Sequence, residues 1–185
     1  METMILGLAI FFSIHLLPSV PPLRNALFKK LGEKPYRGIY ALVSLTGLVL
    51  VVIGMGETGF VAVWEPPKWS YMVTNLSMLV ALYCLVAMHM QSNLKRFTAH
   101  PMLWGITFWS GGHLMSNGDQ ASIVLFGSFL VYSLVAMASA NLRGARPAGK
   151  KISLRYDAMI AVISTVAYVG LANLHLYFAG VELIR

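Results

Sequence analysis

Six stretches of this sequence contain no Asp, Glu, Lys or Arg, and each is close to the length of about 20 residues that an α-helix needs to cross a bilayer. They cover residues 4–20, 39–56, 69–90, 99–116, 120–140 and 158–180. Charged residues make up 11% of the chain, less than half of the roughly 25% found in soluble domains. The sequence therefore predicts an all-α, polytopic membrane protein, a six-transmembrane-helix bundle that forms one domain over residues 1–185.

The basic residues are concentrated in alternate loops. In the loops and termini on the other side of the membrane from these basic loops, the basic residues are Lys68 and Arg185. The positive-inside rule makes the basic loops cytoplasmic and both termini periplasmic. Because this charge lies against the membrane, it favours anionic lipid headgroups as partners and argues against nucleic acid. The first, third and fifth loops hold Arg24, Lys29, Lys30, Lys34 and Arg37; Lys95 and Arg96; and Arg143, Arg146, Lys150, Lys151 and Arg155.

The first of these loops has a pattern of its own. Pro21 and Pro22 can open a helix, and Gly32 can close one. Between them, leucine recurs at every fourth position, which is typical of a short amphipathic helix at the membrane interface. An ordinary basic loop is the alternative interpretation. The leucines are Leu23, Leu27 and Leu31.

All five histidines fall within the apolar stretches, and three of them, His15, His113 and His175, are expected to sit in lipid. A polar ring in hydrocarbon is costly and rare, which makes each of them a candidate functional residue, with helix packing as the simpler interpretation. At 1.5 Å per residue, His15 lies about 16 Å from the outer end of its span, His113 about 5 Å and His175 about 7 Å. His89 and His100 fall near the cytoplasmic ends of their spans.

Any metal site in this chain has to be assembled between helices. His100 and His113 are about 20 Å apart along one helix and about 140° apart around it, so they cannot share an ion. The spans contain no carboxylates for acid–base work, and the single cysteine, Cys84, allows no intramolecular disulfide. Imidazoles on different helices of an apolar bundle suit a bis-histidine haem b, which is flat and apolar.

The sequence resembles the NnrU family along essentially its whole length. The most specific part is the run Ala-His-Pro-Met-Leu-Trp-Gly at residues 99–105, followed by Trp109 and then His113. The first span contributes Phe-Ser-Ile-His at residues 12–15, and the loop after it contributes Leu-Arg at 23–24 and Tyr-Arg-Gly-Ile-Tyr at 36–40. His175 on the last span completes the likeness.

The resemblance implies a multi-pass protein of the bacterial inner membrane that is linked to nitrite and nitric oxide respiration (denitrification). The family is related to zeta-carotene isomerase, in which a haem b with two histidine ligands supports a redox-dependent cis–trans isomerisation. The matching metal ligands here are His15 and His113, with His175 as the substitute. That isomerase has a cysteine three residues before the second histidine, where this chain has Ser110. Trp109, Ser110 and Asn173 are predicted to lie beside the haem, and His100 stays a weaker candidate for contact with it.

Three functions follow from this resemblance. The first is a haem-based sensor or accessory factor in nitrite and nitric oxide metabolism. The second is a haem-dependent isomerase that acts on a polyene or another apolar small molecule. The third is a non-catalytic assembly or scaffold protein. A membrane methyltransferase of the isoprenylcysteine type fits less well, because Ala99 and Ile106 replace the charged residues that flank its His-Pro motif.

Overall fold

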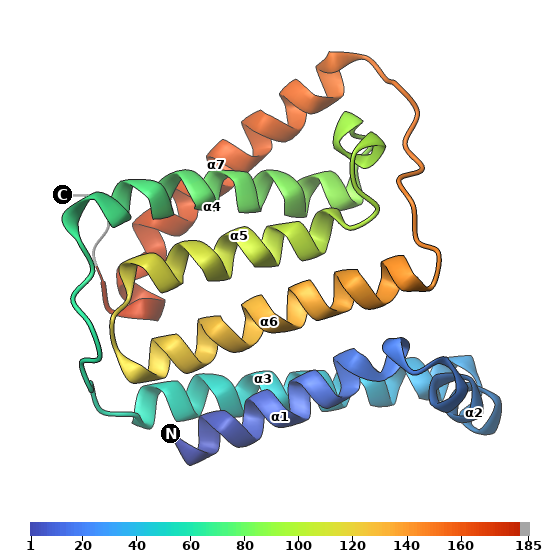
Figure 1. Cartoon of the computed structure of the whole chain (residues 1–185), viewed down its shortest axis with the longest axis horizontal. Helices are drawn as coiled ribbons and strands as arrows, with labels where there is room; N and C mark the ends of the chain where they lie inside the picture. The colour runs from blue at the N-terminus through green and yellow to red at the C-terminus, as the bar shows by residue number, and fades with distance from the viewer. Residues whose placement is uncertain (182–185) are drawn as a thin grey trace. The chain divides into compact units, whose positions relative to one another are not determined.

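The computed structural model describes residues 1–181, and within that range the chain is helical apart from its loops and one isolated β-bridge (Figure 1). Arg185, which the sequence analysis placed on the periplasmic side, lies outside the described residues. The α-helices are α1 (Glu2–Leu16), α2 (Pro21–Leu31), α3 (Glu33–Glu57), α4 (Lys68–His89), α5 (Pro101–Ser116), α6 (Gln120–Leu142) and α7 (Leu154–Ala179), and two 3-10 turns, η1 (Leu17–Ser19) and η2 (Asn93–Arg96), follow α1 and α4.

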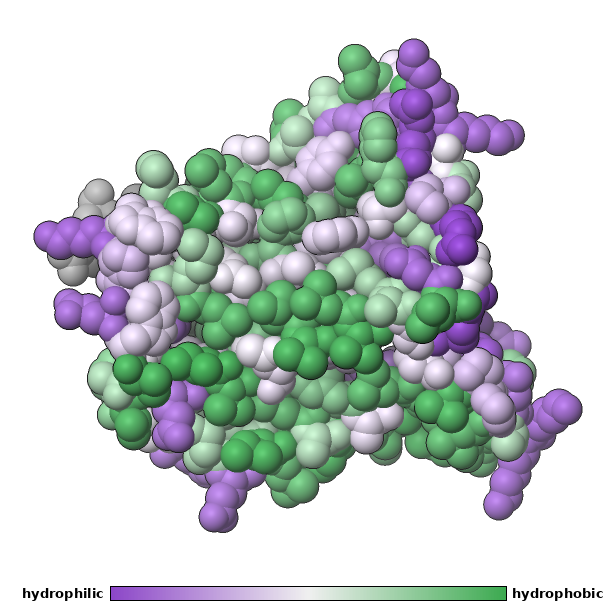
Figure 2. Space-filling model, in the orientation of Figure 1, coloured by the Kyte–Doolittle hydropathy of each residue, from purple (hydrophilic) through white to green (hydrophobic). Residues whose placement is uncertain are grey.

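Every predicted span corresponds to one helix, and the predicted amphipathic helix in the first loop is α2. Within residues 1–181, five segments are long and apolar enough to cross a membrane: α1 with η1, α3, α4, α6 and α7. The remaining apolar helix, α5, has 16 residues, slightly fewer than the about 17–25 typical of a membrane span. Figure 2 shows apolar side chains over the middle of the helices and hydrophilic ones near their ends.

Contacts between Cα atoms divide the chain into two compact units, which are described separately. The first unit comprises residues 1–65 and 118–128, and the second comprises residues 66–117 and 129–185. Helix α6 is continuous through the division, so that its first turns belong to one unit and the rest to the other. The single domain over residues 1–185 stays a prediction.

In the first unit, α1 packs closely against α3 through glycines. A Cβ atom added at Gly7 would lie 2.6 Å from the backbone nitrogen of Val51, and one at Gly47 would lie 2.8 Å from that of Phe11. These spacings leave no room for a methyl group, so the two backbones approach as closely as helices can. Met4, opposite Gly54, is fully buried in this contact.

The connection from α3 to α4 is held to the start of α6 by backbone hydrogen bonds. The Val63 amide donates to the Gly118 carbonyl at 2.8 Å, and the Gln120 amide donates to the Val61 carbonyl at 2.9 Å. Asp119 caps α6, because its Oδ1 accepts from the Ser122 amide at 2.9 Å. The loop and the helix start therefore form one ordered edge of the first unit.

In the second unit, α4 packs against both α5 and α7. The Thr74 hydroxyl on α4 lies 2.7 Å from the Gly112 carbonyl on α5, where a Cβ atom at Gly112 would be 3.0 Å from the Ser77 side chain. A glycine and a small hydroxyl residue thus bring the two helices together. Cys84 is buried in α4, as a small core residue would be.

The start of α7 is anchored by Asp157, which the sequence analysis left outside the last span. Its carboxylate accepts hydrogen bonds from the Tyr83 hydroxyl at 3.0 Å, the Ser92 hydroxyl at 3.1 Å and the Asn93 amide at 3.0 Å, and also from the Asn93 side chain. Asn93 is fixed in turn by the Ile152 backbone. A carboxylate with this many donors is well satisfied, so α7 begins at Leu154, before the apolar stretch.

We expect the substitution Gly47→Ala to destabilise the protein. Alanine normally stabilises a helix relative to glycine by about 0.5–1 kcal/mol, but overpacking costs about 1–3 kcal/mol. Gly38→Ala, on the same helix with nothing within 4 Å of an added Cβ, is the matched control and should be neutral or stabilising. Thermal unfolding in detergent, followed by circular dichroism, measures both variants. Equal melting temperatures for the two variants would contradict the close α1–α3 contact.

We expect the substitution Asp157→Ala to cost about 1–3 kcal/mol or more, because it leaves several part-buried donors without their acceptor. Glu33→Ala removes another carboxylate near a helix start, but its ion pair with Arg37 is exposed and should be worth less than about 1 kcal/mol. Urea or thermal unfolding in detergent compares the two variants. A loss for Glu33→Ala as large as that for Asp157→Ala would show that the anchor has no special role.

Candidate functional site

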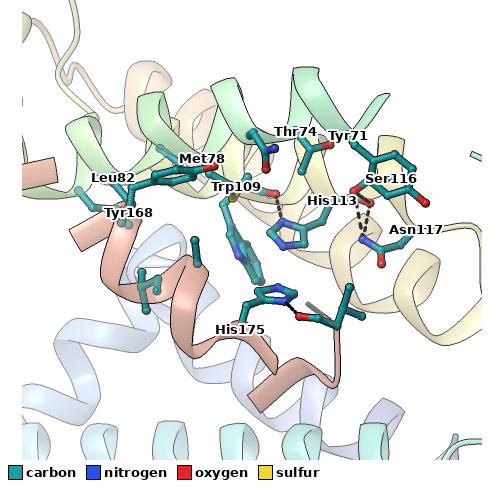
Figure 3. A pocket seen from close by; sticks show the side chains of 16 residues that line it. Tyr71, Thr74, Met78, Leu82, Trp109, His113, Ser116, Asn117, Tyr168 and His175 are labelled. Carbon is teal, nitrogen blue, oxygen red and sulfur yellow. Dashed lines mark hydrogen bonds between the residues drawn. The ribbon is translucent and has the colours of Figure 1, made fainter. Parts of the chain in front are cut away.

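The second unit contains a pocket of about 190 Å³ enclosed by α4, α5 and α7 (Figure 3). Both His113 and His175 line it, on α5 and α7 respectively. None of the lining residues is Asp, Glu, Lys or Arg, so an uncharged or internally neutralised ligand suits it best. The lining residues are Tyr71, Thr74, Asn75, Met78, Ala81, Leu82, Leu85, Trp109, His113, Ser116, Asn117, Tyr168, Leu171, Ala172, His175 and Val181.

The lining changes from polar to apolar along the helices. Tyr71 and Asn75 come from the first turns of α4, and Ser116 and Asn117 from the end of α5. Farther along α4 the lining becomes Met78, Leu82 and Leu85, and farther into α7 it includes Leu171. The two histidines therefore lie toward the more polar end of a pocket whose other end is mainly apolar, with Tyr168 as a polar residue there.

The ring of His113 is held in the last turn of α5. Its Nδ1 lies 2.8 Å from the carbonyl oxygen of Trp109, one turn earlier. Because a carbonyl can only accept, Nδ1 carries the proton and Nε2 carries the lone pair. A histidine that donates Nδ1–H to a backbone carbonyl has the tautomer and orientation typical of a metal ligand. The Trp109 ring packs against the imidazole, with centroids 5.6 Å apart.

His175 has the same arrangement by a different route. Its Nδ1 lies 2.9 Å from the carbonyl oxygen of Val181, six residues later. Helix α7 ends at Gly180, whose φ of +70° turns the chain back toward the last turn of the helix. The turn brings the Val181 carbonyl to the imidazole, and Nε2 of His175 is again the nitrogen with the lone pair. Figure 3 shows the His113 and His175 rings and the Trp109 indole near one another, in the middle of the side chains that line the pocket.

His15 belongs to the first unit and lies in the last turn of α1. Its Nδ1 lies 2.8 Å from the Phe11 carbonyl, so its tautomer matches that of the other two. The ring stacks on Phe11 with centroids 3.9 Å apart, and Tyr40 of α3 lies 5.4 Å away on the same measure. In all three histidines of the apolar helices, Nδ1 therefore donates to a backbone carbonyl.

The other predicted site residues lie outside the pocket lining. His100 occupies the N-cap position of α5. Its Nε2 lies 2.8 Å from Asn141 Oδ1, so Nε2 is the donor in His100, whereas Nδ1 is the donor in His15, His113 and His175. His89 is the exposed last residue of α4. Ser110 is fully buried and donates to the Ile106 carbonyl at 2.7 Å, while the side chain of Asn173 donates to the Val169 carbonyl at 2.7 Å.

The donor chemistry of the pocket fits a haem better than a protein-coordinated ion. No group of three or more His, Cys, Asp or Glu side chains in the described part of the chain is arranged to hold a metal. A haem iron requires only one or two axial imidazoles, because the porphyrin supplies the other ligands. The pocket is smaller than the about 300–1,000 Å³ typical of ligand sites, so a macrocycle would extend beyond it.

Sequence reasoning missed the polar residues that share the pocket with the histidines. Asn75 is the only Asn or Gln in the stretch 69–90, and a lone amide within an apolar span is a signal that could have been used. Asn117 follows the end of α5, and its side chain donates to the His113 carbonyl at 2.8 Å. Tyr71 and Tyr168 carried no such signal, because tyrosine is common near membrane interfaces.

Comparison with known proteins gives one match. Residues 3–183 match the model of the family described as NnrU protein. Neither a curated protein nor a solved structure matches the chain. Because that match extends over nearly the whole sequence, including every helix described above, the chain belongs to the NnrU family.

Proposed function

We propose that this chain is a multi-pass protein of the bacterial inner membrane, with six spans and periplasmic termini, that binds haem b and acts as a sensor or accessory factor in nitrite and nitric oxide metabolism. The observation that carries the proposal is that His113, whose Nδ1–H donates to the Trp109 carbonyl, shares one uncharged pocket with an imidazole from another helix. A second imidazole with the same tautomer, His175, lines the same pocket. Family membership supports the link to nitrogen-oxide metabolism.

His113 is the first axial ligand in this proposal, and two residues compete to be the second. The pocket favours His175, which lies on a neighbouring helix at the same polar end. The family resemblance favours His15, whose Nδ1 is likewise bonded to a backbone carbonyl. His100 is disfavoured, because its Nε2 is bonded to Asn141.

The protein's own residues would tune such a site in three ways. A backbone carbonyl that accepts Nδ1–H makes the imidazole a stronger donor, and Trp109 provides that carbonyl to His113. Apolar residues such as Met78 and Leu82 keep water away. When bound, haem would supply an iron able to bind nitric oxide. Because His113 and His175 come from different helices, a change at either ring alters how α5 and α7 pack against α4.

A second function is favoured by the apolar half of the pocket. Met78, Leu82, Leu85 and Leu171 offer a surface without charge, which suits a polyene or another apolar small molecule. A haem-dependent isomerase of such a molecule is therefore the alternative. The scaffold function would need no occupant in the pocket, and its histidines would serve packing only.

Haem content tests the proposed function directly. We expect the detergent-purified protein, expressed with haem available, to give a b-type pyridine haemochrome and a six-coordinate, low-spin Soret band. His113→Ala should retain less than about one-tenth of the haem, because even partners of metal ligands are worth about 10–100-fold in affinity. His89→Ala, outside the pocket, is the control and should retain haem. A well-folded wild-type protein without haem would leave the scaffold function standing.

The ferric spectra of two variants distinguish the two candidates for the second axial ligand. Of His175→Ala and His15→Ala, the variant that removes the second ligand should convert the ferric spectrum from six-coordinate low-spin to five-coordinate high-spin. We expect that variant to be His175→Ala if the pocket holds the whole axial pair. The same change in His15→Ala alone would assign the pair to His113 and His15. Titration with nitric oxide, and product analysis in a polyene-producing host, then distinguish a sensor from an isomerase.

A further inference from the structure

Helix α2 is confined to a membrane surface by its neighbours along the chain. It follows α1 after η1, a turn of three residues, and Gly32 alone separates it from α3. Both α1 with η1 and α3 are long and apolar enough to cross a membrane. Gly32, with φ of +79°, makes the sharp turn between α2 and α3. Whichever way the chain is inserted, α2 therefore lies where two spans leave the bilayer, provided that the proposed membrane placement is right.

The apolar side chains of α2 gather on one side of the helix. At 100° per residue, Leu23, Leu27, Phe28 and Leu31 fall within an arc of about 140°, which also contains Arg24. None of the residues of α2 is buried, and Leu23 is 52% exposed. The Phe28 ring contacts Tyr36 of α3, with centroids 5.5 Å apart, which covers one edge of this arc. The part of this arc that Tyr36 does not cover is an exposed apolar strip, and its contact with water is unfavourable.

The charges around this strip are almost entirely positive. Between Leu17 and Met55 the single acidic residue is Glu33, and it pairs with Arg37 at 2.7 Å. Lys29 lies opposite the strip and Lys30 lies at its edge, beside Leu23. Arg24 lies within the arc, with its guanidinium 6.0 Å from the centre of the Phe28 ring. Within residues 1–181 the segment thus offers cations that form no ion pair with a carboxylate. Those cations are Arg24, Lys29, Lys30 and Lys34.

We propose that α2 lies flat in the headgroup region and binds the phosphates of anionic phospholipids, with Leu23 and its apolar neighbours inserted among the acyl chains. An apolar strip beside uncompensated lysines and arginines is the pattern that recognises such a surface. The phosphate of the bilayer lipid is the ligand, held by Arg24, Lys29 and Lys30. The helix fixes the ends of α1 and α3 at the bilayer boundary, and it does so without any part in haem binding.

The test uses nitroxide labels at two positions. Cys84 is the single cysteine and is buried, so Cys84→Ser gives a background without other labelling sites. Leu23→Cys places a label on the apolar strip, and Asn25→Cys places one about 160° around the helix as the matched control. The full-length protein is reconstituted in nanodiscs of phosphatidylcholine, with or without phosphatidylglycerol. Collision rates with oxygen and with a water-soluble nickel chelate are measured for each label.

We expect the Leu23 label to collide severalfold more with oxygen than with the nickel chelate in discs that contain phosphatidylglycerol, and the Asn25 label to show the reverse. Lys29→Gln combined with Lys30→Gln should reduce the effect of phosphatidylglycerol on the Leu23 label. A Leu23 label that favours the chelate in both lipids would overturn the placement of α2 in the bilayer surface. A Leu23 label that is lipid-accessible to the same degree in both lipids would overturn the recognition of anionic headgroups. Haem content of the same samples, measured separately, tests the proposed function independently.

Discussion

Hydrogen bonds from side chains to backbone carbonyls satisfy most of the polar groups inside the apolar helices, and the buried hydroxyls of Ser70 and Ser164 are exceptions. A hydroxyl or imidazole without a partner in hydrocarbon is costly, and the nearest acceptor is the carbonyl one turn earlier. Ser44 donates to the Tyr40 carbonyl at 2.7 Å, and Thr107 donates to the Leu103 carbonyl at 2.9 Å. His15 and His113 follow the same rule with their Nδ1 atoms. A general requirement of membrane helices thus fixes the tautomer of both histidines.

This rule bears on the choice between packing and ligation. A histidine that serves packing and a histidine that binds iron both donate Nδ1–H to a carbonyl, so that bond alone does not separate the two roles. What separates them is the surroundings of Nε2. His113 and His175 lie at the polar end of one pocket, beside Asn117 and Trp109. Two imidazoles from different helices in one uncharged pocket are more than packing requires, which is why the haem proposal rests on this pair of rings.

Hydropathy, together with the prolines and glycines that mark helix ends, was enough to predict most of the helices. Each uncharged stretch became a helix, and α2 begins at Pro21 and ends before Gly32 as the sequence predicted. The ends were less predictable where charges are satisfied locally. Helix α3 begins at Glu33, six residues before its apolar stretch, because Glu33 and Arg37 pair one turn apart. Helix α7 includes Asp157, because Ser92 and Asn93, distant in sequence, supply its donors.

The candidate site was less predictable than the fold, because it depends on which helices meet. Counting residues placed His113 and His175 at similar depths, and the structure places both in one pocket. That agreement has a simple origin: α5 and α7 both run opposite to α4, so their last turns lie at the same end of the second unit (Figure 1). The hydrogen bond from His175 to the Val181 carbonyl could not be predicted from helical periodicity, because it depends on the turn at Gly180. A histidine near the end of a helix that is followed by glycine therefore has two possible backbone acceptors, one turn back or just past the glycine. The second acceptor orients the ring of His175, so Gly180 and Val181 contribute to the site as directly as the helix does.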